Sequence, residues 1–278
     1  MPNLATWHPQ IVHFAIALLC VGVLFRLISL TGRAVFTGPA AAVLLLVGTG
    51  AAVLAVQSGT DAHGPVERVP GAREAVIEHE DWGKRTRNIF LFVAVLEIGA
   101  LALARRSTRA TKGLTVASAL VGLAGCMALY EAGEHGGDLV YGYAGGVGIR
   151  YGDTADVSRL LIAGLYHSAQ QARTRHDSAA AADLFGELAR RFPDDTTVRF
   201  LAIESLVRDR NDGKGALAAL ARLSVPADNQ RLRLRYDFLK ADAFVAVGRA
   251  DSARATLERL AVAFPDNPRI KDRLAQIK

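Results

Sequence analysis

Four long apolar runs in the first half of the chain constrain its fold more than any other feature. They span 11–30, 39–57, 89–104 and 113–130, and the only charged residues within them are Arg26 and Glu97. A helix needs about 20 apolar residues to cross the hydrocarbon core of a bilayer. The third run is short, so we expect its helix to begin outside the membrane. Small residues recur in the second and fourth runs and favour close helix packing in lipid. The pattern predicts a four-helix transmembrane bundle.

The second half of the chain contains an internal repeat. Phe-Pro-Asp at 192–194 recurs at 264–266, 72 residues later, which equals two units of 36. Turn signals at Asp177, Asp212 and Asp251 lie 35 and 39 residues apart, and a helical pattern follows each. This spacing resembles that of tetratricopeptide repeats, whose helix pairs stack into a solenoid with a period of about 34 residues. Such solenoids present an extended surface to protein partners; an inert stabilising domain is the alternative.

These patterns together predict an all-α protein. We expect a four-span transmembrane domain at 1–150, a linker at 151–164 and a tetratricopeptide-like α-solenoid at 165–278. The net charge of +6 divides into 12 basic and 10 acidic residues at 1–150, and 21 and 17 thereafter. Nucleic-acid binding requires a clustered basic face, so this scattered excess argues against a nucleic-acid partner.

The basic residues also bear on orientation. The loop at 105–112 holds Arg105, Arg106, Arg109 and Lys112 without an acid, whereas five basic residues are diluted over 58–88. Basic loops stay on the cytoplasmic side. The two counts are nearly tied, and charge density favours placing both termini on the periplasmic side of a bacterial-type inner membrane.

Five of the seven histidines are expected at one membrane face. They are His8, His13, His63, His79 and His135, and the alternation of four spans brings them to the same side. Proline is favoured at the first helical position, so a helix entry at Pro9 places His13 about 6 Å inside the helix. An ionisable residue in a span is a functional-site hypothesis. Any single histidine here is more simply explained by a hydrogen bond to the backbone, but five together indicate a cofactor or metal site.

Two charges and two cysteines lie within the spans. Arg26 and Glu97 fall on the same side of the bilayer, and pairing lowers the cost of burying either charge. We therefore expect a buried ion pair that stabilises the bundle, rather than a proton relay. Cys20 and Cys126 form neither a disulfide framework nor a zinc ligand set.

The segment His-Pro-Gln-Ile-Val-His-Phe at 8–14 resembles the HPxxVHF opening of a bacterial membrane family, the domain of unknown function 2231 family. His-Glu-Asp-Trp-Gly at 79–83 and His-Gly-Gly-Asp-Leu-Val-Tyr-Gly at 135–142 resemble its later landmarks. Ala15 departs from the proline that is common there, and Trp82 is shifted by one position. The likeness covers about 7–150. The family has no settled activity, but related architectures imply a b-type haem role, which would map onto His13, His79 and His135.

A haem b iron takes two axial ligands from facing helices. His79 lies nine residues before its apolar run, about 13 Å above it, so His13 and His135 match better in height unless the third helix bends. A zinc or copper site at His8, His13, His79 and His135 is the alternative, since imidazole suits both metals.

The expected function is that of a membrane redox subunit, either b-type cytochrome-like or metal-binding, with a repeat domain that docks a protein partner. The alternative is a non-catalytic scaffold or assembly subunit of a larger membrane complex, without a cofactor. The electron donor and acceptor stay open.

Overall fold

The computed structural model describes residues 3–149, 153–226 and 228–277. These residues form helices and no strand, so the all-α prediction is confirmed. The chain divides into two compact units, Met1–Val157 and Ser158–Lys278. Each unit is described by itself.

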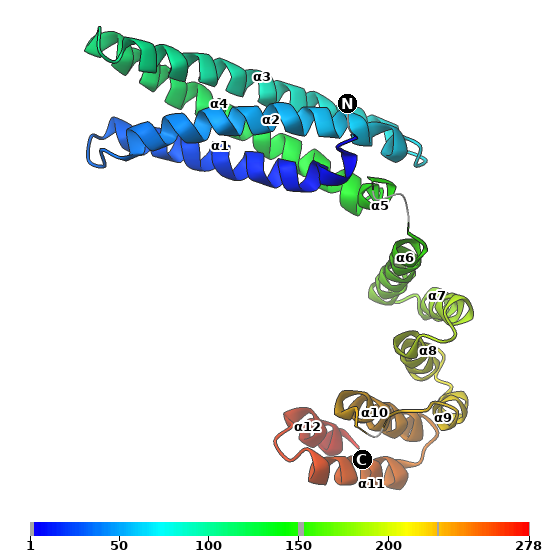
Figure 1. The fold of residues 1–278 in the computed structure, drawn as a ribbon. Helices are drawn as coiled ribbons and strands as arrows, with labels where there is room; N and C mark the ends of the chain where they lie inside the picture. Colours follow the sequence, from blue (N-terminus) through cyan, green and yellow to red (C-terminus); the bar gives the residue numbers. More distant parts are fainter. Residues whose placement is uncertain (1–2, 150–152, 227, 278) are drawn as a thin grey trace. The chain divides into compact units, whose positions relative to one another are not determined.

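Four long helices build the first unit (Figure 1). They are α1 (His8–Leu30), α2 (Thr37–Glu67), α3 (Arg73–Leu103) and α4 (Thr108–Tyr141), preceded by the short 3-10 turn η1 (Ala5–Trp7) and followed by α5 (Gly145–Ile149). All four are long and apolar enough to cross a membrane. At 1.5 Å per residue, the 31 to 34 residues of α2, α3 and α4 exceed the length needed to span it. The third helix therefore begins well before its apolar run, as expected.

Glycines let the four helices approach one another closely. A Cβ atom added at Gly48 of α2 would lie 2.8 Å from Leu19 of α1, and one at Gly125 of α4 would lie 2.8 Å from Phe90 of α3. Leu19 and Phe90 belong to one buried cluster at the centre of the bundle. Larger side chains at these glycines would push the helices apart, so the small residues fix the register of the bundle.

Seven helices follow the bundle. They are α6 (Thr154–Thr174), α7 (Ser178–Arg191), α8 (Thr196–Arg208), α9 (Gly213–Ala221), α10 (Gln230–Ala246), α11 (Ala250–Ala263) and α12 (Pro268–Gln276). Five of them start at an Asp or Asn whose side chain accepts a backbone N–H: Asp177, Asp195, Asp212, Asn229 and Asn267. Such caps satisfy donors that a helix start leaves unpaired. Of the three turn residues predicted for the repeat, Asp177 and Asp212 cap helix starts, whereas Asp251 is the second residue of α11, which follows Arg249.

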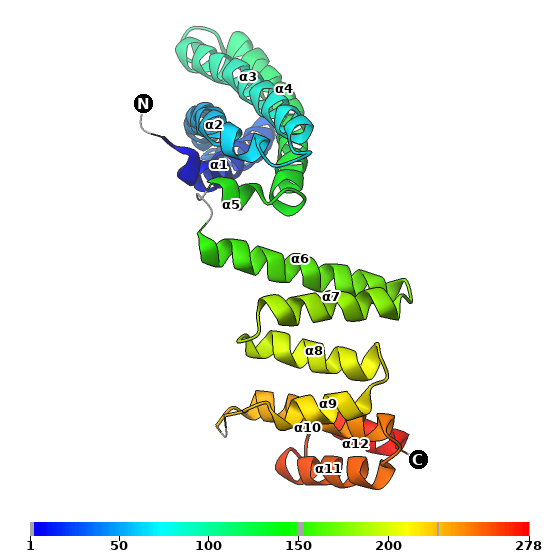
Figure 2. The ribbon, with the colours of Figure 1, turned by 90° about the vertical axis from the view of Figure 1, so that its right-hand side faces the viewer.

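Consecutive helices of the second unit pack on their neighbours in alternating directions (Figure 2). Phe185, Leu188 and Val198 join α7 and α8 to α6 in one buried cluster. Arg173 of α6 donates to Asp209 at 2.7 Å. Assignment to the tetratricopeptide class stays a prediction. Residues 151 and 152 of the expected linker lie outside the described residues, and 154–164 form the first half of α6.

Candidate histidine site at one end of the bundle

His8 and His79 face each other inside one end of the bundle. Their ring centroids are 6.2 Å apart, and the ring planes are nearly perpendicular, at 82°. His8 is the first residue of α1, and His79 lies two turns into α3. Both α1 and α3 pack along α2 and α4. The two imidazoles therefore approach each other across the interior of the bundle.

Both imidazoles are anchored through the same ring nitrogen. The Ser58 hydroxyl donates to the Ala55 carbonyl at 3.0 Å, so its oxygen accepts from His8 Nδ1 at 2.9 Å. His79 Nδ1 donates to the Ala132 carbonyl at 2.9 Å, because a carbonyl can only accept. Nδ1 therefore carries the proton in both rings, and each Nε2 keeps a free lone pair. Metal-ligating histidines are usually fixed in this way by a contact to the second nitrogen.

Small residues surround the pair. A Cβ atom at Gly59 would lie 3.1 Å from His8 Cε1, and one at Gly136 would lie 2.9 Å from His79 Cε1, so both rings pack directly on glycine. Gly83 follows His79 by one turn, and a Cβ atom there would meet no heavy atom within 4 Å.

Thr86 follows His79 by two turns on the same face of α3. It is 3% exposed, and its hydroxyl has no hydrogen-bond partner among the described residues. A buried polar group without a partner is rare and marks a place where a further group can bind. Gly83 and the unpaired Thr86 hydroxyl thus lie about 6 Å and 10 Å along α3 from His79.

His8 and His79 lie at one level of the bundle, since their ring centroids are 6.2 Å apart. Two residues separate His8 from its apolar run, whereas nine residues, about 13 Å of helix, separate His79 from the third run. The first turns of α3 beside His8 are therefore polar. The site therefore lies at the polar end of the bundle.

His13 does not join this pair. It is exposed on α1, and its Nδ1 donates to the Pro9 carbonyl at 2.6 Å. The reason is helical phase: His13 follows His8 by five residues, and 100° per residue places the two side chains about 140° apart around the helix. Both cannot point into the same interior.

His135 and His63 occupy separate places at the same end. The His135 ring stacks on Trp82 with centroids 6.5 Å apart, and its Nδ1 lies 3.5 Å from a Glu78 carboxylate oxygen. His63 lies 3.3 Å from Glu67. In the described ranges, no group of three or more His, Cys, Asp or Glu side chains is placed to hold a metal ion. The set of four histidines expected from the sequence is thus divided, and His8 and His79 alone face each other.

Arg26 and Glu97 form a buried ion pair inside the bundle, toward the end opposite the histidines. Arg26 Nε donates to Glu97 Oε1 at 2.8 Å, and Nη2 donates to Oε2. The Ser118 hydroxyl also donates to Glu97. The two charged residues are 4% and 0% exposed. Buried Phe90 and Val93 lie between His79 and Glu97 along α3, so the ion pair is separate from the histidine site.

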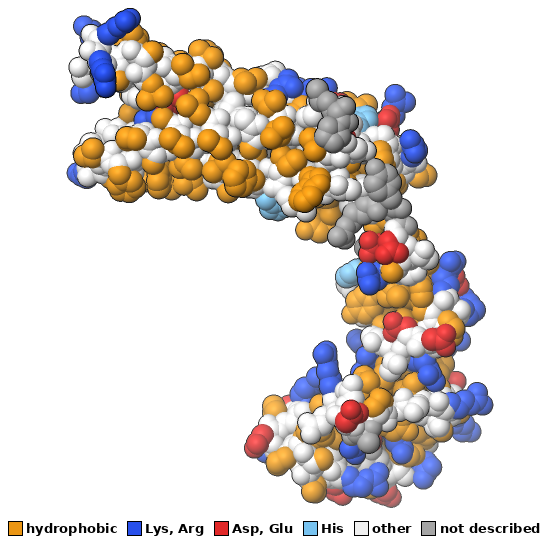
Figure 3. Space-filling view, viewed as in Figure 1, with side chains coloured by type: hydrophobic (Ala, Val, Ile, Leu, Met, Phe, Trp, Pro, Cys, Tyr) orange, Lys and Arg blue, Asp and Glu red, His pale blue; other side chains and the backbone are white. Residues whose placement is uncertain are grey.

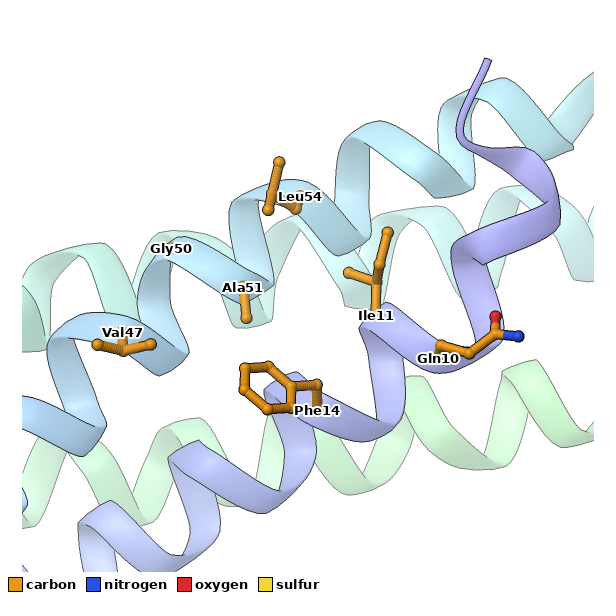
Figure 4. A pocket seen from close by; sticks show the side chains of 7 residues that line it. All are labelled: Gln10, Ile11, Phe14, Val47, Gly50, Ala51 and Leu54. Atoms are coloured by element: carbon orange, nitrogen blue, oxygen red, sulfur yellow. The ribbon is translucent and has the colours of Figure 1, made fainter. Parts of the chain in front are cut away.

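A groove of about 490 Å³ lies on the outer surface of the bundle between α1 and α2 (Figure 4). It is lined by Gln10, Ile11, Phe14, Val47, Gly50, Ala51 and Leu54. The lining has no ionisable side chain, and neither histidine of the pair reaches it.

Comparison with known proteins agrees with the opening motif and the four spans. A family model described as "Predicted membrane protein (DUF2231)" matches residues 5–148. The chain belongs to this family. The DUF2231 match includes both His8 and His79 and ends before the second unit. No curated protein and no solved structure is significantly similar to the chain.

Proposed function

We propose that this DUF2231 protein is a membrane redox subunit in which His8 and His79 ligate a metal cofactor. The facing pair of anchored imidazoles carries the proposal. The ring centroids of the two imidazoles lie 6.2 Å apart, close enough for His8 and His79 to hold one metal ion between them.

The donor set favours haem b over zinc. Structural zinc sites take four protein ligands and catalytic sites three, whereas only two imidazoles converge here. A haem iron would be held by imidazole side chains such as those of His8 and His79. On the face of α3 that carries His79, Gly83 has no side chain, and the Thr86 hydroxyl, about 10 Å further along the helix, is an unpaired donor for a bound group. Copper is the alternative metal, since imidazole also suits it.

Each residue of the site has a defined task in this proposal. A bound haem would supply one-electron transfer. Ser58 and the Ala132 carbonyl hold the proton on Nδ1, which keeps each Nε2 available as a ligand. Gly59 and Gly136 let the rings lie close to α2 and α4.

The second unit has a supporting part in the proposal. Its stacked helices offer an extended surface of the kind that repeat proteins use to dock a protein partner. The density of basic residues in the loop at 105–112 supports a periplasmic location of both termini. A scaffold or assembly subunit is the second candidate, and the large share of the chain given to stacked helices favours it.

Replacement of single histidines tests the proposal. The full-length protein is purified in detergent, and its visible absorption spectrum and metal content are measured for the wild type and four variants. We expect a Soret band that is lost in His8→Ala and His79→Ala and kept in the controls His13→Ala and His63→Ala. Wild-type protein without haem or metal would favour the scaffold. Full occupancy in His79→Ala would refute the site.

A further inference from the structure

The end of the bundle opposite the histidines carries five basic side chains and no free acid. The five are all exposed: Arg33, Arg105, Arg106, Arg109 and Lys112. The sequence has no Asp or Glu at 27–60 or 98–130. Glu97, the one acid nearby, is bonded to Arg26. The five charges are therefore not neutralised by the described part of this unit.

The fold gathers these charges in one place, here called the basic end. Arg33 lies in the connection between α1 and α2, and the other four lie from the end of α3 to the first turns of α4. Figure 3 shows Lys and Arg side chains over the end of the bundle where α3 meets α4. Both α2 and α4 start at this end, and their helix dipoles add to the positive potential.

Exposed apolar side chains border the basic end. Val35 is 86% exposed and Phe36 is 68% exposed, and both lie in the same connection as Arg33. A surface that combines basic and apolar side chains at the end of a membrane span matches the boundary between lipid headgroups and acyl chains.

We infer that the basic end binds the phosphate headgroups of anionic phospholipids. An arginine guanidinium pairs with phosphate oxygens through two parallel hydrogen bonds. Val35 and Phe36 would then lie in the acyl region beside the bound lipids. A lipid fits better than an acidic protein because the charges lie at the edge of an apolar surface that a bilayer surrounds.

The histidine end supplies a matched control. The five basic residues at 58–88 lie among six acids, and they are Arg68, Arg73, Lys84, Arg85 and Arg87. Arg73 pairs with Glu67 at 3.0 Å, and Lys84 pairs with Glu80 at 2.9 Å. Charge pairing leaves less net potential for a lipid phosphate. Removing three basic residues there changes the formal charge by the same amount as removing three at the basic end.

Thermal unfolding with added lipid tests the inference on the full-length protein in detergent. Phosphatidylglycerol or phosphatidylcholine is titrated into the wild type, the Arg105→Gln/Arg106→Gln/Arg109→Gln variant and the control Arg68→Gln/Arg73→Gln/Arg87→Gln variant. We expect phosphatidylglycerol, but not phosphatidylcholine, to raise the unfolding temperature of the wild type and the control. The first triple variant should need at least about a tenfold higher phosphatidylglycerol concentration for the same rise.

Several results would overturn the inference. They are an equal response of the wild type to both lipids, an unchanged phosphatidylglycerol response in the first variant, or an equal loss in both triple variants. Inorganic phosphate that acts as strongly as phosphatidylglycerol would overturn the lipid assignment.

Should the glutamine variant fold poorly, Arg105→Lys/Arg106→Lys/Arg109→Lys keeps the charge and loses the paired hydrogen bonds. It should respond between the wild type and the glutamine variant, and a response equal to wild type would contradict arginine–phosphate pairing.

Discussion

Replacement of Glu97 by glutamine should destabilise the bundle strongly. The change removes one charge and leaves the Arg26 guanidinium, 4% exposed, without its counter-charge. Removing one partner of a buried ion pair costs about 3–5 kcal/mol. At about 1.4 kcal/mol per factor of ten, the ratio of folded to unfolded protein falls by a factor of about 10² to about 4 × 10³. Replacing both Arg26 and Glu97 by leucine should restore most of this loss, because no unpaired charge remains.

Reversible unfolding of the purified protein by a denaturing detergent measures this effect. Glu74→Gln is the control, since Glu74 is exposed and surface replacements change stability by about 0.5 kcal/mol or less. We predict that Glu97→Gln unfolds at a much lower detergent concentration than Glu74→Gln, and that the double leucine variant lies close to the wild type. Equal midpoints for Glu97→Gln and Glu74→Gln would refute this, as would a double variant that is no more stable than Glu97→Gln.

Three further predictions concern the register of the bundle and the second unit. The thiols of Cys20 and Cys126 lie within hydrogen-bonding reach, so a membrane-permeant oxidant should join α1 to α4 by an intramolecular disulfide; a gel shift that persists in Cys126→Ser would contradict this. Burial raises the pKa of Asp237, so the folded state favours the protonated acid and the carboxylate weakens the unit at neutral pH. Asp237→Asn should therefore raise the unfolding temperature at pH 7, with a gain that vanishes as the pH falls below about 4; a lower temperature at pH 7 would count against it. Residues 158–278 expressed alone should be soluble and helical by circular dichroism, and an unfolded product would oppose a self-contained repeat unit.

The large elements follow from the sequence because their signals are local. A run of apolar residues fixes a span wherever it lies in the chain, and Asp177 or Asp212 marks a helix start through its own side chain. Even the pairing of Arg26 with Glu97 follows from simple counting, because each lies at a known height in its span. Such features depend on spacing along one helix.

The histidine site depends on the direction in which each side chain points around its helix axis. Position along the axis places His8 and His13 at the same membrane face, but the step of five residues between them turns the side chains about 140° apart around α1. The same calculation applied to α3 would have placed Gly83 and Thr86 on the face of His79. The anchors at Ser58 and the Ala132 carbonyl come from other helices, so the packing register supplies them.

Reconstitution with haem tests the central claim most directly. Haem is titrated into cofactor-depleted full-length protein, and the visible spectrum is followed for the wild type and for His8→Ala/His79→Ala. We predict saturation at one haem per chain in the wild type, with the spectrum of iron bound by two imidazoles, and no saturable binding in the double variant. Equal saturable binding by both proteins, or none by the wild type, would contradict a haem site at His8 and His79.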